Sequence, residues 1–148
     1  GEGNFDGFTA LATADGTVVD VAKATVTAAN VITELGKIVD AIPSAVYGAD
    51  DLHIYVSQNI YRAYVRALGG FGASGLGVKV YATSGLADNN AMAARSSNLF
   101  FGTGLLNDRN EVKVIDMSDI DGSQNCRIIM RYTAGVQIGI GADVVLYS

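Results

Sequence analysis

Residues 50–70 read DDLHIYVSQNIYRAYVRALGG, and this stretch decides the fold. Leu52–Val56 is rich in β-branched and aromatic residues, which indicates a short strand. Ser57 follows at once, and its hydroxyl can accept a hydrogen bond from the first free amides of a helix over Gln58–Leu68. Apolar residues recur at helical spacing along that helix, and Gly69-Gly70 ends it. A strand that leads directly into an amphipathic helix predicts helices packed on a sheet.

A second helix is predicted upstream, over residues 31–42, where apolar side chains form one stripe with a period of 3.6 residues. Thr27 or Asn30 can cap its start. Pro43 disfavours helical backbone at the residue before it and therefore closes the helix. Residues 1–26 are small and polar with scattered β-branched residues, so we expect an irregular segment with at most a short edge strand.

Downstream, the sequence indicates mainly strands. Residues 83–97 form a polar segment of small residues, in which Ala91–Arg95 is predicted to form one helical turn. Strands are predicted from their composition and alternation over 78–82, 99–101, 111–115, 126–133, 136–140 and 143–147. The order strand, helix, strand and then consecutive strands predicts one α+β domain over residues 1–148. Its two main helices pack on a mixed or antiparallel sheet.

The composition is low in charge and rich in glycine. Charged residues make up 17% of the chain, against roughly 25% in a typical soluble domain. Gly accounts for 18 of the 148 residues. The net charge of −5 argues against a dedicated nucleic-acid-binding protein, which would carry a basic surface. No apolar run reaches the roughly 18–20 residues of a membrane span. We interpret the low-charge surface as one that neighbouring chains cover.

The motifs that would carry enzyme chemistry are weak. Gly70–Gly75 matches G-x-G-x-x-G, but it follows a helix and precedes a strand, which is the wrong context for binding a pyrophosphate. We therefore interpret it as a flexible connection. Ser74 lies near a nucleophile-elbow pattern but lacks the strand that must precede it. His53 is interpreted as a partly buried structural imidazole, with a role as general base as the less favoured alternative.

Metal and disulfide sites are also disfavoured. One His and one Cys cannot build a zinc site without a second chain, and Cys126 is predicted to be a small buried hydrophobic residue. Asp116, Asp119 and Asp121 lie within six residues, which leaves open a calcium loop, but the spacing departs from the EF-hand pattern. A solvated turn between strands is the favoured interpretation.

Arg62 and Arg66 are four residues apart on the helix that follows the first strand, so they share a face. A solvated helix surface is the favoured interpretation. The alternative is a contact with the acidic loop 116–121 of another subunit.

Several stretches resemble tailed-phage major capsid proteins. Residues 50–68 are similar to the strand-then-helix segment of that family, and 76–86 to its glycine, strand and small-residue loop. The similarity continues, in order, through the upstream helix 31–42 and through 98–104, 127–132, 135–140 and 143–147. It implies the axial domain of the Hong Kong 97-type capsid fold, together with C-terminal strands of the peripheral domain. Because the family's N-terminal arm, extended loop and spine helix have no match here, we expect the chain to be a piece of a longer protein.

The resemblance implies a structural subunit of a tailed-phage or prophage capsid, made in the bacterial cytoplasm, that self-associates into the icosahedral shell of the virion. Its partners would be copies of itself, with packaged DNA contacted only indirectly. No enzyme activity, cofactor, metal, membrane or small-molecule substrate is expected. The alternatives are a decoration or tail component or, less favoured, a small ligand-binding or hydrolytic domain that uses His53. The low-charge loops and the basic helix supply the predicted subunit contacts, which are Arg62, Arg66, Gly72, Ser74, Asn89, Asn90, Asn107 and Arg109.

Overall fold

The strand and helix predicted between residues 50 and 70 are present as β2 (Leu52–Ser57) and α3 (Gln58–Ala67). The chain then forms β3 (Lys79–Thr83), which pairs in parallel with β2, so α3 is the crossover that parallel strands require. Ser57 is the N-cap of α3, but its hydroxyl donates to Asn59 Oδ1 at 2.6 Å and makes no bond to a helix amide. Gly69, with a φ of 74°, has the left-handed backbone that follows many helices.

A computed structural model describes residues 5–69, 78–103, 112–117, 122, 126–130 and 133–148. Within them, the main sheet has the strand order β1-β9-β4-β2-β3. The two outer pairs are parallel, and β4 is antiparallel to both β2 and β9, so the predicted mixed sheet is confirmed. The strands not yet bounded are β1 (Val19–Val21), β4 (Ala91–Arg95) and β9 (Val145–Tyr147).

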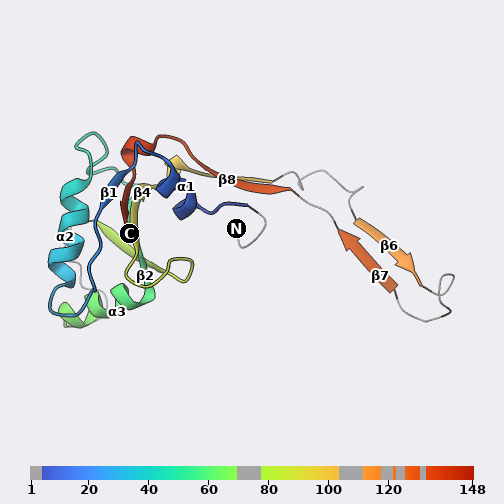
Figure 1. The fold of residues 1–148 in the computed structure, drawn as a ribbon, viewed down its shortest axis with the longest axis horizontal. Helices are drawn as coiled ribbons and strands as arrows, with labels where there is room; N and C mark the ends of the chain where they lie inside the picture. The colour runs from blue at the N-terminus through green and yellow to red at the C-terminus, as the bar shows by residue number, and fades with distance from the viewer. Residues whose placement is uncertain (1–4, 70–77, 104–111, 118–121, 123–125, 131–132) are drawn as a thin grey trace.

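Helices cover the two faces of this sheet unequally (Figure 1). One face packs on α3 and on α2 (Val31–Ala41), and the core between them contains fully buried Ile38, Ile54 and Ile60. α2 ends before Pro43, as predicted. The other face packs on the short helix α1 (Phe8–Ala14) through a second, smaller core. We call the main sheet and these three helices the body.

α1 contradicts the expectation that residues 1–26 are irregular. Its seven residues are too few for the helical period to stand out in the sequence. Ala12 is buried in the second core, and Phe8 and Leu11 pack against it. Tertiary contact rather than local propensity therefore holds this helix. The short edge strand expected in the same segment is present as β1, at one edge of the main sheet.

The helical turn predicted at Ala91–Arg95 is wrong, because these residues form β4 in the interior of the sheet. Ala, Met and Arg favour helix by intrinsic propensity. Here, pairing with β2 on one side and with β9 on the other outweighs that preference. Ala91 and Ala93 face the first core while Met92 and Ala94 face the second, so the small side chains of β4 serve both layers.

A two-stranded ribbon leaves the body and consists of β5 (Leu99–Thr103) and β8 (Ala134–Ile138), paired antiparallel. Figure 1 shows it extending from the body, with β6 (Val112–Asp116) and β7 (Cys126–Met130) paired further out. We call β5 and β8 the ribbon, and β6 and β7 the outer hairpin. These strands lie where the sequence predicted strands.

One buried acidic group is fully satisfied within the body. Glu34 of α2 is 7% exposed and accepts hydrogen bonds from Lys37 Nζ and from the Tyr147 hydroxyl, each at 2.8 Å. The backbone amide of Ala24 donates to the same hydroxyl at 2.8 Å. Glu34 thereby joins α2, the last strand and the segment that follows β1. Among the described residues, none of the helices has the length and apolar character needed to cross a membrane.

Candidate subunit interface

On one face of the main sheet, no helix among the described residues covers β2 and β3. α1 covers β4 and β9, whereas the same face of β2 and β3 presents His53, Tyr55 and Tyr81. The His53 ring lies edge-on to the Tyr81 ring, with centroids 4.9 Å apart, and the two tyrosine rings are 6.5 Å apart. Tyr81 is 49% exposed on the edge strand. The three rings form an aromatic patch that no described element of the chain covers.

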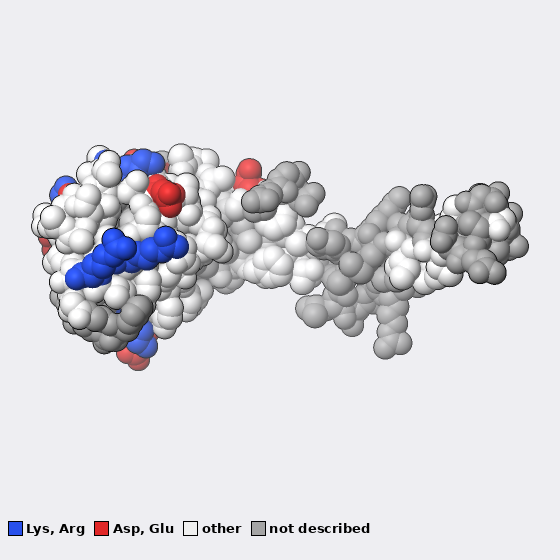
Figure 2. Space-filling view, turned by 90° about the horizontal axis from the view of Figure 1, so that it is seen from below, with Lys and Arg blue, Asp and Glu red and all other residues white. Residues whose placement is uncertain are grey.

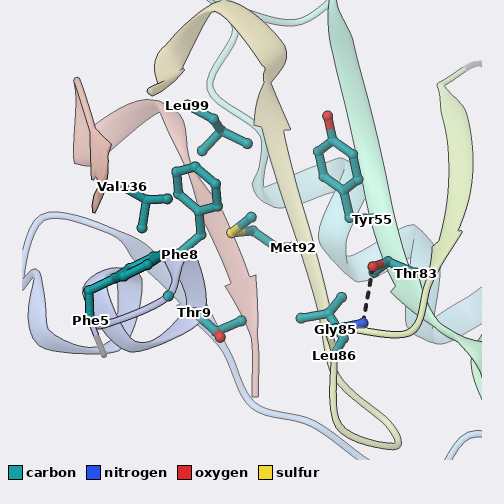
Figure 3. A pocket seen from close by; sticks show the side chains of 11 residues that line it. Phe5, Phe8, Thr9, Tyr55, Thr83, Gly85, Leu86, Met92, Leu99 and Val136 are labelled. Carbon is teal, nitrogen blue, oxygen red and sulfur yellow. Dashed lines mark hydrogen bonds between the residues drawn. The ribbon is translucent and has the colours of Figure 1, made fainter. Parts of the chain in front are cut away.

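An apolar groove of about 650 Å³ separates this patch from α1 (Figure 3). Phe5 and Phe8 line one side, Tyr55 and Leu86 the other, and Met92 lies between them. Burial, and next the neighbouring Tyr81, raise the pKa of Tyr55, so its hydroxyl stays protonated at neutral pH. None of the described residues that line the groove is acidic, basic, His or Cys. The groove therefore suits apolar side chains rather than acid–base chemistry.

The ribbon continues the groove outward. Leu99 and Val136, at its base, line the groove, and Val136 pairs across the ribbon with Phe101. Phe101 is 66% exposed and its neighbour Phe100 is 54% exposed. Because successive strand residues point to opposite faces, the two phenylalanines present large apolar surface on both sides of the ribbon.

The outer hairpin is apolar in the same way. Val114 and Ile128 pair directly across the two strands and are 67% and 69% exposed. An isolated two-stranded unit is at best marginally stable in water, and apolar side chains without cover mark interaction sites. The ribbon and the outer hairpin together are therefore candidate contact surfaces for another chain.

Arg62 and Arg66 are both exposed on α3, as their spacing predicted. Figure 2 shows the side of the body on which α3 lies, where basic side chains form one strip on an otherwise mostly uncharged surface. Neither arginine forms an ion pair with any residue that the structure describes. Their role in a subunit contact stays a prediction.

Asn89 and Asn90 act within the body. Asn89 has a φ of 62°, and its Oδ1 accepts from the Val26 amide and from Asn59 Nδ2, each at 3.0 Å. The carbonyl of Asn90 accepts from the Ser57 amide at 3.1 Å, and its Oδ1 accepts from Lys23 Nζ at 2.9 Å. The turn before β4 is thus tied to the start of α3 and to the N-terminal segment. These hydrogen bonds lie within the chain, and a subunit contact at Asn89 or Asn90 stays a prediction.

Four of the predicted contact residues, Gly72, Ser74, Asn107 and Arg109, lie outside the described residues, as does the Gly70–Gly75 motif. Asp119 and Asp121 also lie outside them. In the part of the chain that the structure does describe, no three His, Cys, Asp or Glu side chains gather closely enough to hold a metal ion.

Two single-residue predictions have different outcomes. His53 is partly buried in the aromatic patch, as expected, and is not among the residues that line the groove. Cys126 is exposed at the start of β7, so the prediction of a small buried hydrophobic residue is wrong. The alternation of β7 placed it on an apolar face, but no layer covers that hairpin in the described residues.

The exposed aromatic residues of the ribbon were not among the predicted contacts, because the sequence identified residues 99–101 only as a short strand. Phe100 and Phe101 are consecutive in a strand, so at most one of them can face a single core. Two consecutive phenylalanines in a strand were therefore the sequence signal that one of them lies outside the core.

No family model matches the sequence, and no curated protein is similar to it in sequence. Solved structures share its fold. A chain from Mycobacterium phage Che8 is 12% identical with a TM-score of 0.66, and the match covers 89% of this chain and 53% of that one. A virus-like particle from Pyrococcus furiosus is 11% identical with a TM-score of 0.59, covering 93% and 57%. The capsid of an empty GTA particle is 14% identical with a TM-score of 0.58, covering 88% and 49%.

The present chain therefore spans about half the length of these solved chains. At identities of 11–14% the likeness concerns the fold alone. The α+β architecture predicted from the sequence is confirmed, and this chain has a capsid-like fold.

Proposed function

We propose that this chain is part of the structural subunit of a capsid-like shell and that it assembles through contacts between copies of itself. The observation that carries the proposal is the combination of a capsid-like fold with large apolar side chains on the ribbon and on the outer hairpin that no described element covers. Phe100, Phe101, Val114 and Ile128 are each more than half exposed. Apolar surface of this kind is stabilised when a neighbour removes it from water.

The finer proposal is a major head protein of a tailed phage or prophage with the Hong Kong 97-type fold. The sequence resemblance supports it, as does the similarity to a chain from a mycobacterial phage. In this assignment the body corresponds to the axial domain, and the ribbon with the outer hairpin corresponds to strands of the peripheral domain. The shell would enclose DNA without this chain recognising its sequence.

The shapes of the two regions favour head-to-tail contacts. The exposed phenylalanines of the ribbon form a different surface from the aromatic patch on β2 and β3 of the body. Two different surfaces that meet form a heterologous interface, and such interfaces close into rings when the rotation between copies permits. A low charge density suits surfaces of this kind, because the cores of interfaces are depleted in charged residues.

The proposed role requires no catalysis. The groove is lined by aromatic, aliphatic and hydroxyl-bearing side chains, which bind apolar groups but supply no acid–base pair.

The test is to express the protein encoded by the complete gene and to examine it by electron microscopy and sedimentation velocity. We expect rings or closed shells whose formation grows with protein concentration. A folded protein that sediments as a monomer at every concentration examined would overturn the proposal.

A further inference from the structure

Two short 3-10 turns connect the ribbon to the body. η1 (Ser96–Asn98) leads from β4 into β5, and η4 (Gly141–Asp143) leads from the end of β8 into β9. β4 and β9 are hydrogen-bonded neighbours in the main sheet, as β5 and β8 are in the ribbon. The ribbon is thus a continuation of one pair of sheet strands, and its direction is set where the two turns lie (Figure 1).

Asn98 joins the two turns through three hydrogen bonds. Its Nδ2 donates to the Ile140 carbonyl at 2.8 Å, and its Oδ1 accepts from the Ile140 amide at 2.7 Å. Its own carbonyl accepts from the Gly139 amide at 3.0 Å. A carboxamide offers both a donor and an acceptor, so this side chain pairs with Ile140 as a neighbouring strand would. Asn98 is 9% exposed, which strengthens the constraint that these bonds impose.

The packing at this point leaves no room for a side chain on the second connection. A Cβ built on Gly139 would lie 2.7 Å from Asn98 Oδ1 and 2.9 Å from Phe100 Cε2. A Cβ built on Gly141 would overlap Asp15 and Thr17, which form the turn between α1 and β1. Both connections are therefore in direct contact with each other and with the body.

Asp51, the residue before β2, also forms hydrogen bonds with η1. Its carboxylate accepts from Arg95 Nε at 2.8 Å and from the Ser97 hydroxyl, and its backbone carbonyl accepts from the Ser96 amide at 2.9 Å. The Ser97 hydroxyl, and then Arg95, hold the pKa of Asp51 below its ordinary range, so the carboxylate is ionised at neutral pH. η1 is thus bonded to the start of β2 as well as to the second connection.

We propose that Asn98 is a positioning residue that fixes the angle between the ribbon and the body. The competing explanation is that α1, which packs on Ile138 and Leu99 at the base of the ribbon, is sufficient to hold it. One consequence rests on the proposed function: in an assembled shell, the angle between the ribbon and the body would determine where a neighbouring copy meets the ribbon.

The direct test is a distance distribution between the two regions, measured by pulsed electron spin resonance on the soluble chain. Nitroxide labels are placed at Asp40 of α2 and Gln137 of β8, both exposed, in a background that carries Cys126→Ser. Asn98→Ala is expected to broaden the distribution at least about twofold. A distribution as narrow as that of the unsubstituted chain would overturn the proposal and leave α1 packing as the explanation.

Asn30→Ala is the matched control. Asn30 also bonds through both ends of its carboxamide, accepting from the Thr27 amide at 2.7 Å and donating to the Thr25 carbonyl at 3.0 Å. It lies at the start of α2, away from the two turns. We expect Asn30→Ala to leave the width of the distribution unchanged, and broadening equal to that of Asn98→Ala would contradict a specific role for Asn98.

Hydrogen exchange supplies a second readout that does not depend on the labels. Loss of the Asn98 side chain is expected to speed exchange of the Ile140 amide about tenfold, since that amide loses its acceptor, while Val145 in β9 is unaffected. If Asn98→Ala does not fold, exchange is measured in the unsubstituted chain instead. An Ile140 amide that exchanges there as fast as an unprotected amide would overturn the proposed role of Asn98. Both measurements use the unassembled chain, so their failure is distinguishable from a failure to form particles.

Discussion

The body and the ribbon are built from the same kind of strand, yet their apolar residues have different surroundings. In the body, β2 alternates between two layers, and Leu52, Ile54 and Val56 are all buried under α2 and α3. In the ribbon, β5 also carries large apolar side chains, but Phe100 and Phe101 lie more than half exposed. Buried contacts within the chain therefore stabilise the body, whereas Phe100 and Phe101 of the ribbon have no comparable cover in the described residues.

Among the residues that the structure describes, the hydrogen bonds between distant polar side chains are likewise found in the body rather than along the ribbon. Glu34, Asp51, Asn89 and Asn98 each bond elements that are distant in sequence, and all four bonds lie in the body or at its boundary with the ribbon. Among the described side chains, no buried polar atom lacks a partner. Long-range side-chain hydrogen bonds therefore hold the body and its boundary with the ribbon, and the ribbon projects beyond them.

The largest expected effect is a difference in the free energy of unfolding between the same Ile→Ala substitution in the body and in the outer hairpin. Ile54→Ala removes a fully buried side chain from the first core, and we expect it to lower the free energy of unfolding by about 2–5 kcal/mol. Ile128→Ala, in the outer hairpin where Ile128 is 69% exposed, should change it by less than about 0.5 kcal/mol. Urea denaturation monitored by circular dichroism measures both. Equal losses would mean that the outer hairpin belongs to the folding core.

Substitution of one glycine at the boundary and of one in the ribbon tests how tightly each region is packed. Gly141→Ala places a Cβ against Asp15 and Thr17, and we expect a loss of about 1–3 kcal/mol as the α1–β1 turn is displaced. Gly135→Ala, in the ribbon, meets no atom within 4 Å and should be close to neutral. Thermal unfolding of the two variants provides the comparison, and a destabilised Gly135→Ala with a neutral Gly141→Ala would reverse it.

Removal of a single tyrosine hydroxyl is expected to cost stability at a buried position and not at an exposed one. Tyr147→Phe removes the hydroxyl that donates to Glu34 Oε2 and accepts from the Ala24 amide, so we expect about 1–3 kcal/mol of destabilisation. Tyr81→Phe, on the exposed edge strand, should have no measurable effect. Chemical denaturation distinguishes the two, and a neutral Tyr147→Phe would contradict the assignment of Glu34 as a structural anchor.

The smallest expected effect is the change in melting temperature at low pH. The Ser97 hydroxyl, then Arg95, lower the pKa of Asp51 from its ordinary value of 3.8. A carboxylate with a lowered pKa contributes stability above its unfolded pKa and loses that contribution as the pH falls through its folded pKa. Melting temperatures should therefore decline below about pH 4, and Asp51→Asn should decline less steeply. An unchanged slope in the variant would show that Asp51 contributes little to stability, in keeping with its partly exposed side chain.

The sequence predicted the elements whose signals are local. The helix at 31–41 and the strand-helix unit at 52–67 have clear periods and breakers, and the structure places them within one or two residues of the expectation. β4 could not be predicted in this way, since Ala and Met favour helix and only its two neighbours in the sheet make it a strand. α1 is likewise held by contacts with residues more than 120 positions away.

The candidate interface was harder to predict than the fold. Asn89 and Asn90 looked like surface residues in a polar loop, but their side chains bind Val26 and Lys23, which no local pattern reveals. Phe100 and Phe101 were predicted only as part of a strand. Whether an apolar strand is covered depends on the number of layers in the fold, which is a tertiary property.

The most direct test of the central claim is particle formation by the protein of the complete gene carrying Phe101→Asp, with Tyr47→Asp as a control. Both substitutions exchange an exposed aromatic residue for the same charge, one in the ribbon and one in the body, where Tyr47 is 53% exposed. We predict that Phe101→Asp abolishes particles seen by electron microscopy while the melting temperature of the unassembled protein stays unchanged, and that Tyr47→Asp still assembles. Normal particles from Phe101→Asp, or unfolding of the body by that substitution, would contradict the account.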